Sequence, residues 1–164
     1  MDFLWSPWRY RYLATAGQEP GCIFCRALEA NDDAAMGIVL RGKQAFVILN
    51  KFPYTTGHVM IVPYAHVGEL TNCDGQTLAE IMELSQRVQA ALEETYHPQG
   101  YNLGMNLGRA AGAGVLGHLH MHLLPRWAGD SNFMTTIGET RVEPEDLATT
   151  YEKLRGALGN PGSR

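Results

Sequence analysis

Three histidines alternate with apolar residues in the segment HLHMHLLP, which begins at His118. Successive side chains of a β-strand point to opposite faces, so the pattern predicts a strand over 118–124 that Pro125 ends. On this strand His118, His120 and His122 share one face, and the apolar residues between them lie on the core face. Neighbouring imidazoles can hold a metal ion, or they can act as a nucleophile and as proton handlers.

Extended segments also occur over 37–41, 44–49, 58–64 and 101–107, where apolar residues are bounded by glycine or proline. Short links between the early segments favour antiparallel pairing. An amphipathic pattern predicts one long helix over 74–96. The sequence therefore predicts an α+β fold, with an antiparallel β-sheet of about five strands, one long helix and a C-terminal helix.

The long helix should begin after the capping residue Asp74 and stop at the segment HPQG, which begins with His97. Its predicted apolar face consists of Leu78, Ile81, Met82, Ser85, Val88 and Leu92. The chain divides into an aromatic N-terminal arm over 1–20, a central domain over 21–142, and a C-terminal helix and tail over 143–164.

The charge balance restricts the classes of partner. The chain of 164 residues has 13 basic and 17 acidic side chains, and its net charge of −4 argues against binding to a nucleic-acid backbone. No apolar run approaches the roughly 18 residues of a membrane span. The N-terminal MDFLWSPWRYRYL carries charge and proline where a signal peptide is apolar. We therefore expect a cytoplasmic protein that binds no nucleic acid and no membrane.

Cys22 and Cys25 form a CxxC motif, whose spacing suits two zinc ligands. His66 and His118 are the candidates for the remaining two ligands. A site closed by four protein ligands would be structural and would pin the N-terminal segment to the sheet. His118 cannot be a ligand and a free catalytic base at once, so a bound metal leaves the chemistry to the other histidines. The alternative is a reduced cysteine pair packed in the core.

A glycine-rich stretch, GRAAGAG over 108–114, precedes the histidines. Its backbone N–H groups suit phosphate oxygens, although it matches neither the dinucleotide fingerprint nor a P-loop. Arg126, just past the histidine segment, is our candidate for a cation that stabilises phosphoryl charge.

The motif HLHMHLL, the upstream NKFPYTTGHVMIVPYAH and the motif CIFC together resemble the histidine triad (HIT) superfamily of nucleotide hydrolases and transferases. The segments WSPWR and PRWAGDSNFM are similar to a bacterial branch of diadenosine tetraphosphate phosphorylases. The resemblance implies a HIT-like nucleotide-binding domain over 21–142. It further implies an enzyme that cleaves dinucleoside polyphosphates at the α-phosphate, through a covalent nucleotidyl-histidine intermediate.

The resemblance also implies roles for individual residues. His120 would be the nucleophile, and His122 and His58 would orient it and tune its protonation. Zinc-bearing members of the family use equivalents of His66 and His118 as ligands. The residues implied at the nucleotide are Asn50 at the ribose, Ile23, Phe24 and Leu49 at the base, and Asn106, Gly112 and Gly114 at the phosphates.

One position departs from the family pattern. Family hydrolases carry glutamine and then serine or threonine in the glycine-rich loop, whereas this chain has Gly114 and Val115. The loss of polar side chains fits an altered acceptor, such as inorganic phosphate in place of water. The resemblance further implies a nucleotide substrate, no organic cofactor, and a homodimer formed through the long helix and the adjacent strand.

Other functions remain open from the residues alone. One is hydrolysis of nucleoside phosphoramidates or dinucleoside polyphosphates within the same superfamily. Another is a zinc metallohydrolase in which His118, His120 and His122 bind a metal that activates water. A third is a nucleotide-binding protein without catalysis.

Overall fold

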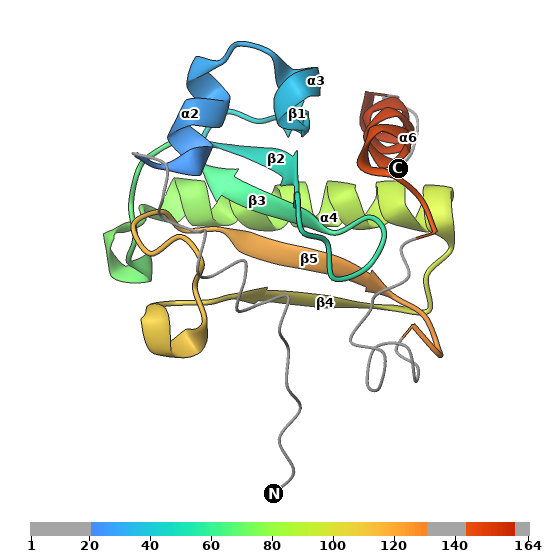
Figure 1. The fold of residues 1–164 in the computed structure, drawn as a ribbon. Coiled ribbons are helices and arrows are strands. Elements are labelled where there is room, and N and C mark those ends of the chain that lie inside the picture. Colours follow the sequence, from blue (N-terminus) through green and yellow to red (C-terminus); the bar gives the residue numbers. More distant parts are fainter. Residues whose placement is uncertain (1–20, 131–143, 160–164) are drawn as a thin grey trace, which may run out of the picture.

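The computed structural model describes residues 21–130 and 144–159 (Figure 1). The predicted arm over 1–20 lies outside the described residues. Five strands form one sheet in the order β1-β2-β3-β5-β4, and every neighbouring pair is antiparallel. The strands are β1 (Ile38–Arg41), β2 (Ala45–Leu49), β3 (Val59–Pro63), β4 (Gly100–Met105) and β5 (Met121–Arg126). The predicted α+β class is confirmed.

Helix α4 (Gly75–Tyr96) packs against one face of the sheet. Its N-terminus is capped because the Asp74 carboxylate accepts hydrogen bonds from the backbone N–H groups of Gln76 and Thr77. It ends at His97, which adopts a left-handed conformation with φ of 46°. The prediction that Met82 belongs to the apolar face is wrong, because its side chain is 51% exposed. Leu84, which the prediction omitted, is buried instead.

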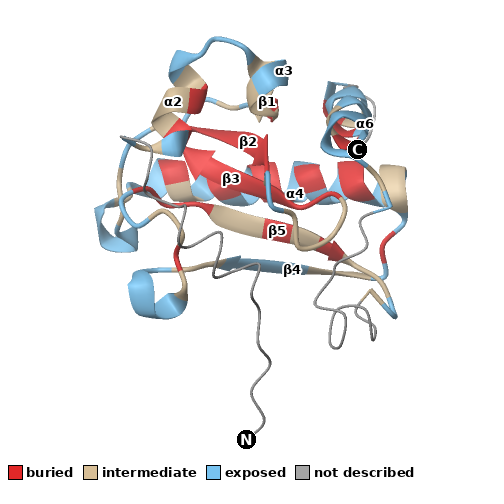
Figure 2. Ribbon diagram, viewed as in Figure 1, coloured by how far each residue is buried: buried red, intermediate tan, exposed pale blue. Residues whose placement is uncertain are grey.

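The opposite face of the sheet carries α2 (Ile23–Glu29) and α3 (Asp33–Met36) at the N-terminal end of the described chain (Figure 1). Phe24 and Ala27 of α2 pack on apolar side chains of β1, β2 and β3. Strands β2 and β3 are consequently buried on both faces (Figure 2). The two apolar layers hold the sheet between α4 on one side and α2 on the other.

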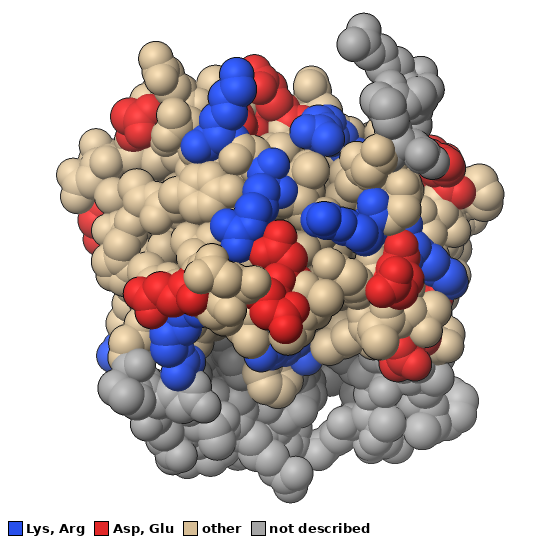
Figure 3. Space-filling view, turned by 90° about the horizontal axis from the view of Figure 1, so that it is seen from above, with Lys and Arg blue, Asp and Glu red and all other residues tan. Residues whose placement is uncertain are grey.

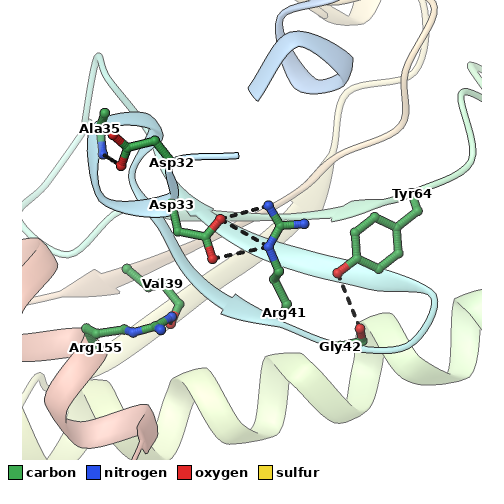
Figure 4. Close-up of polar contacts among 8 residues, drawn as sticks. All are labelled: Asp32, Asp33, Ala35, Val39, Arg41, Gly42, Tyr64 and Arg155. Carbon is green, nitrogen blue, oxygen red and sulfur yellow. Dashed lines mark hydrogen bonds and ion pairs between the residues drawn. The ribbon is translucent and has the colours of Figure 1, made fainter. Parts of the chain in front are cut away.

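Polar contacts attach the peripheral helices to the sheet (Figure 4). The Arg41 guanidinium of β1 donates to both carboxylate oxygens of Asp33 in α3. Helix α6 (Leu147–Gly159) donates from the Arg155 side chain to the Val39 carbonyl of β1. We predicted this helix from residue 143; it begins at 147 because Asp146 caps it by accepting from the Thr149 N–H.

The histidine segment differs from the prediction in its bounds. β5 begins at Met121, three residues later than expected, because residues 118–120 bond individually to the segment after β3. Leu119 N–H, for example, donates to the Val67 carbonyl at 2.7 Å. β5 also continues through Pro125 to Arg126. The proline is tolerated because the pairing with β4 extends across it, with Tyr101 opposite.

Basic and acidic side chains are interspersed on the face viewed from above, without a broad patch of one sign among the described residues (Figure 3). Across residues 21–130 and 144–159, no helix combines the length and the apolar character required to cross a membrane.

Candidate active site and metal site

The histidines lie on the face of the sheet opposite α4. Leu123 and Val59 pair across β3 and β5 and pack in the core beneath α4. Side chains alternate along a strand, so His122 and its partner Met60 face the other way, toward α2. His58 comes immediately before β3 and is 1% exposed. The sheet therefore brings His58 and His122 together from segments that lie 64 residues apart.

Hydrogen bonds define the tautomers of these two rings. Tyr54 N–H donates to His58 Nδ1 at 3.1 Å, so this nitrogen is the acceptor and the His58 proton is on Nε2. His58 Nε2 lies 3.0 Å from His122 Nδ1 and donates to it. His122 consequently carries its own proton on Nε2. The Asn50 side chain joins the group, with Nδ2 3.4 Å from His58 Nε2 and Oδ1 accepting from Phe52 N–H.

His120 is held by a different contact. Its Nδ1 lies 2.9 Å from the His118 carbonyl oxygen, which can only accept, so Nδ1 carries the proton and Nε2 carries the lone pair. The His122 ring stands edge-on to it, with centroids 5.0 Å apart. Burial lowers the pKa of His120 below its usual value, although the bond to the carbonyl opposes this shift. A neutral imidazole with an exposed lone pair on Nε2 can act as a nucleophile.

His118 faces the cysteines. Its Nε2 donates to the Pro63 carbonyl at 2.8 Å, which leaves the lone pair on Nδ1. That nitrogen lies 3.2 Å from Cys22 Sγ and 3.7 Å from Cys25 Sγ. His66 Nδ1 lies 3.3 Å from Cys25 Sγ. The four donor atoms are within 4.8 Å of one another. The predicted metal ligands are therefore brought together, and His118 lies with them.

This donor set fits a tetrahedral zinc ion. Zinc bonds of about 2.3 Å to sulfur and about 2.0 Å to nitrogen place neighbouring tetrahedral ligands about 3.6 Å apart. The sulfur–nitrogen contacts of 3.2, 3.3 and 3.7 Å are close to this separation. The Pro63 carbonyl orients the His118 ring as a carbonyl acceptor typically orients a ligating histidine. Burial raises the pKa of the Cys25 thiol, and neighbouring Cys22 raises it further.

The residues predicted at the base are not gathered in one place. Leu49 packs in the core beneath α4, on the face of the sheet opposite the histidines. Phe24 is 1% exposed and lies under the rings of His118 and His120. Ile23 is 44% exposed, so it alone of these three presents much of its surface to solvent. The structure therefore does not form a base pocket from all three side chains.

The glycine-rich loop is partly occupied by its own hydrogen bonds. It forms a short 3-10 turn over Arg109–Ala111, after which Gly112 adopts φ of 85°. Gly112 N–H donates to the Arg109 carbonyl, and Ala113 N–H donates to Gly108. Two amides that we expected to be available for phosphate thus have partners within the loop. Asn106 follows β4 directly and is half-buried.

Arg126 is directed elsewhere. It pairs with Gly100 at the far end of β5, whereas His122 pairs with Gly104. Its guanidinium forms a salt bridge with Asp130 and donates to the Asn102 side chain at 2.6 Å. The structure therefore separates Arg126 from the histidines that it was predicted to assist.

Tyr54 was not predicted as a site residue. Its backbone N–H fixes the His58 tautomer, and its ring lies 4.8 Å from the His58 ring and 6.2 Å from the His122 ring. The available signal was an aromatic residue within the turn NKFPYTTG, four positions before His58.

Comparison with known proteins agrees with this geometry. The HIT domain family model matches residues 32–129. The chain belongs to the HIT domain family. An AP-4-A phosphorylase of Mycobacterium tuberculosis (strain H37Rv) is 38% identical to this HIT protein over 159 residues, covering 92% of this chain and 81% of the relative. The family prediction is confirmed, and so is the expectation of an enzyme, at the level of the family.

Solved HIT structures share the fold. A zinc-bound histidine triad family protein from Mycobacterium smegmatis superposes with a TM-score of 0.70 at 28% identity, covering 85% of this chain and 94% of that chain. A histidine triad nucleotide-binding protein from Sulfolobus tokodaii gives a TM-score of 0.69 at 27% identity, covering 84% and 92%. The four-residue cluster of this HIT chain therefore occurs in a family that includes a zinc-bound member.

Proposed function

We propose that this HIT protein is a nucleotidyl transferase that cleaves dinucleoside polyphosphates at the α-phosphate, with phosphate as the acceptor. The observation that carries the proposal is the His120 tautomer. The bond from Nδ1 to the His118 carbonyl leaves the lone pair on Nε2, on the imidazole that burial favours in its neutral form. The 38% identity to an AP-4-A phosphorylase supports the choice of substrate.

The proposed reaction has two balanced steps. In the first, His120 Nε2 forms a bond to the α-phosphorus while the bridging P–O bond breaks, and its electron pair leaves with the polyphosphate. In the second, an oxygen of inorganic phosphate forms the new P–O bond and the N–P bond breaks. Diadenosine tetraphosphate and phosphate thus yield ATP and ADP. Attack by water would instead yield ATP and AMP.

His58 and His122 would keep His120 in place during these steps. The Tyr54 N–H, His58 and His122 form a chain in which each group donates to the next, so the His122 proton is directed away from His58. A fixed proton at this position can interact with phosphoryl oxygens as negative charge develops on them. Asn50, beside His58, would bind the ribose hydroxyls.

The acceptor is the finer part of the proposal. Gly114 and Val115 are half-buried and offer no polar side chain where family hydrolases have one. Without such groups to position water, we propose that the phosphate dianion, which binds through its own charge, is the better acceptor. We retain Asn106 and Gly114 as phosphate-binding residues.

We further propose that Cys22, Cys25, His66 and His118 bind a structural zinc ion. The support is the donor geometry together with the bond from His118 to Pro63. This assignment removes His118 from the chemistry. It also weighs against the metallohydrolase alternative, because His118, His120 and His122 each contact a different group and do not converge on one point.

A homodimer is also proposed, through α4 and β4. β4 is an edge strand of the sheet, and edge strands offer unpaired backbone groups to a partner. Large apolar side chains are exposed on both elements, namely Leu103 at 44% and Met82 at 51%. Sedimentation of the native protein and of a Leu103→Lys variant would test this, since a dimer predicts a lower mass for the variant.

The function is tested by product analysis. Purified protein is incubated with diadenosine tetraphosphate, with and without phosphate, and the His120→Ala variant is the control. Phosphorolysis predicts ADP and ATP that depend on added phosphate, and no turnover by the variant. Production of AMP regardless of phosphate would show a hydrolase. Unchanged turnover by His120→Ala would remove the proposed nucleophile.

A further inference from the structure

Phe24 occupies an unusual position between the two cysteines of the CxxC motif. It is 1% exposed, and its ring centroid lies 5.3 Å from that of His118 and 5.3 Å from that of His120. One buried side chain therefore contacts both a member of the metal cluster and the proposed nucleophile.

The metal ligands restrain the backbone on both sides of this ring. Cys22 Sγ and Cys25 Sγ lie 3.2 Å and 3.7 Å from His118 Nδ1. A metal held by both thiolates fixes the first turn of α2, where Phe24 is located. The other contacts of Phe24 are apolar and belong to the cluster between α2 and the sheet. Apolar packing is non-directional, so it fixes the ring less strictly than coordination does.

The orientation of the His120 ring determines where its Nε2 points. The Nδ1 bond to the His118 carbonyl fixes one edge, and the His122 ring lies on another side at 5.0 Å. The Phe24 ring covers a further side, inclined at 46° to the imidazole. Reaction requires the nucleophile to be aligned with the phosphorus, and a displacement of about 1 Å can cost about 100-fold in rate.

We propose that Phe24 is a positioning residue that transmits metal occupancy at Cys22, Cys25, His66 and His118 to the orientation of His120. The inference rests on the proposed function for its effect on turnover, although the contact itself can be measured without substrate. Phe24 thus acts through His120 and is not a wall of the base pocket.

The structure offers a matched control in Phe46. It is 0% exposed, belongs to the same apolar cluster, and stacks on Tyr64, not on a histidine. We compare Phe24→Leu and Phe24→Met with Phe46→Leu in the zinc-loaded protein. The Phe24 variants should lose about 10- to 100-fold in kcat with KM within about twofold. Phe46→Leu should lower the melting temperature to a similar degree and leave kcat within about twofold.

A rise in KM at constant kcat for the Phe24 variants would overturn the proposal, because it would indicate contact with the base. Equal losses of kcat in the Phe24 and Phe46 variants would also overturn it. Retention of the Co²⁺ absorption spectrum in the Phe24 variants is expected, since no ligand is removed.

A second measurement does not depend on turnover. The Nδ1–H proton of His120 and its nitrogen shift are followed by NMR while Zn²⁺ is added to the metal-free protein. In the wild type, one equivalent should convert a broadened signal to a single sharp one. Most of this response should be lost in Phe24→Leu. A response equal to that of the wild type would assign the coupling to the His118 carbonyl and refute the role of Phe24. If no dinucleoside polyphosphate is turned over, the proposed function fails while this measurement still decides the inference.

Discussion

His58 Nε2 lies 3.0 Å from His122 Nδ1, and the Tyr54 N–H bond to His58 Nδ1 sets the direction of the proton between them. Replacement of His58 by Asn removes this donor and leaves His122 unoriented. We expect kcat to fall by up to about 100-fold with a smaller effect on KM, because the contact positions groups and does not bind substrate. Steady-state kinetics measure both constants. His97→Asn, at the end of α4, is the control and should behave as the wild type.

The metal cluster predicts a loss of stability when a ligand is removed. Cys25→Ser should reduce bound zinc well below one equivalent and lower the free energy of unfolding. The loss is about 4 kcal/mol when free zinc exceeds the dissociation constant about 1,000-fold. Metal analysis and denaturant unfolding at fixed zinc measure it. Cys73→Ser, a thiol outside the cluster, should change neither quantity, and equal zinc contents in the two variants would contradict the site.

Glu80 predicts a pH-dependent contribution to stability. Its carboxylate accepts from the backbone N–H groups of Lys43, Gln44 and Ala45 in the turn between β1 and β2. Burial alone would raise the pKa of Glu80, but these bonds outweigh it and the pKa lies below the ordinary 4.5. The stabilisation is therefore fully present above pH 4.5 and disappears as the pH falls through the lowered pKa.

Glu80→Gln should accordingly destabilise the protein by about 1–3 kcal/mol at pH 7. The difference from the wild type should shrink in acid, as the wild-type carboxylate becomes protonated. Denaturant unfolding at several pH values measures this. Glu83→Gln, on the exposed side of the same helix, is the matched control. A difference that grows in acid would contradict the assignment.

Arg126 predicts a small effect on turnover. Its guanidinium is bound to Asp130 and Asn102 at the far end of β5. Arg126→Ala should therefore leave kcat/KM for diadenosine tetraphosphate within about threefold, while surface salt bridges of this kind contribute about 0–1 kcal/mol to stability. A loss of 100-fold or more would return Arg126 to the phosphate site.

Periodicity predicted much of this molecule. The alternation of His120 with His122 placed both on one face, and the 3.6-residue pattern placed α4 within two residues of its observed bounds. The face occupied by Leu49 could not be predicted, because every residue of β2 is buried and no polar alternation marks either side. Spacing likewise carries no information on the Arg126–Asp130 pair or on the burial of Phe24, since both depend on tertiary contacts.

The segment from His118 to His122 contributes to two centres within five consecutive positions. His118 bonds to the loop after β3, and His122 is in register with Met60 on the same strand. An insertion or deletion between them would shift one centre against the other, whereas substitutions at Leu119 or Met121 would preserve both. Evolution can therefore vary the residues of this segment but not its length, and neither centre can be relocated without losing the other.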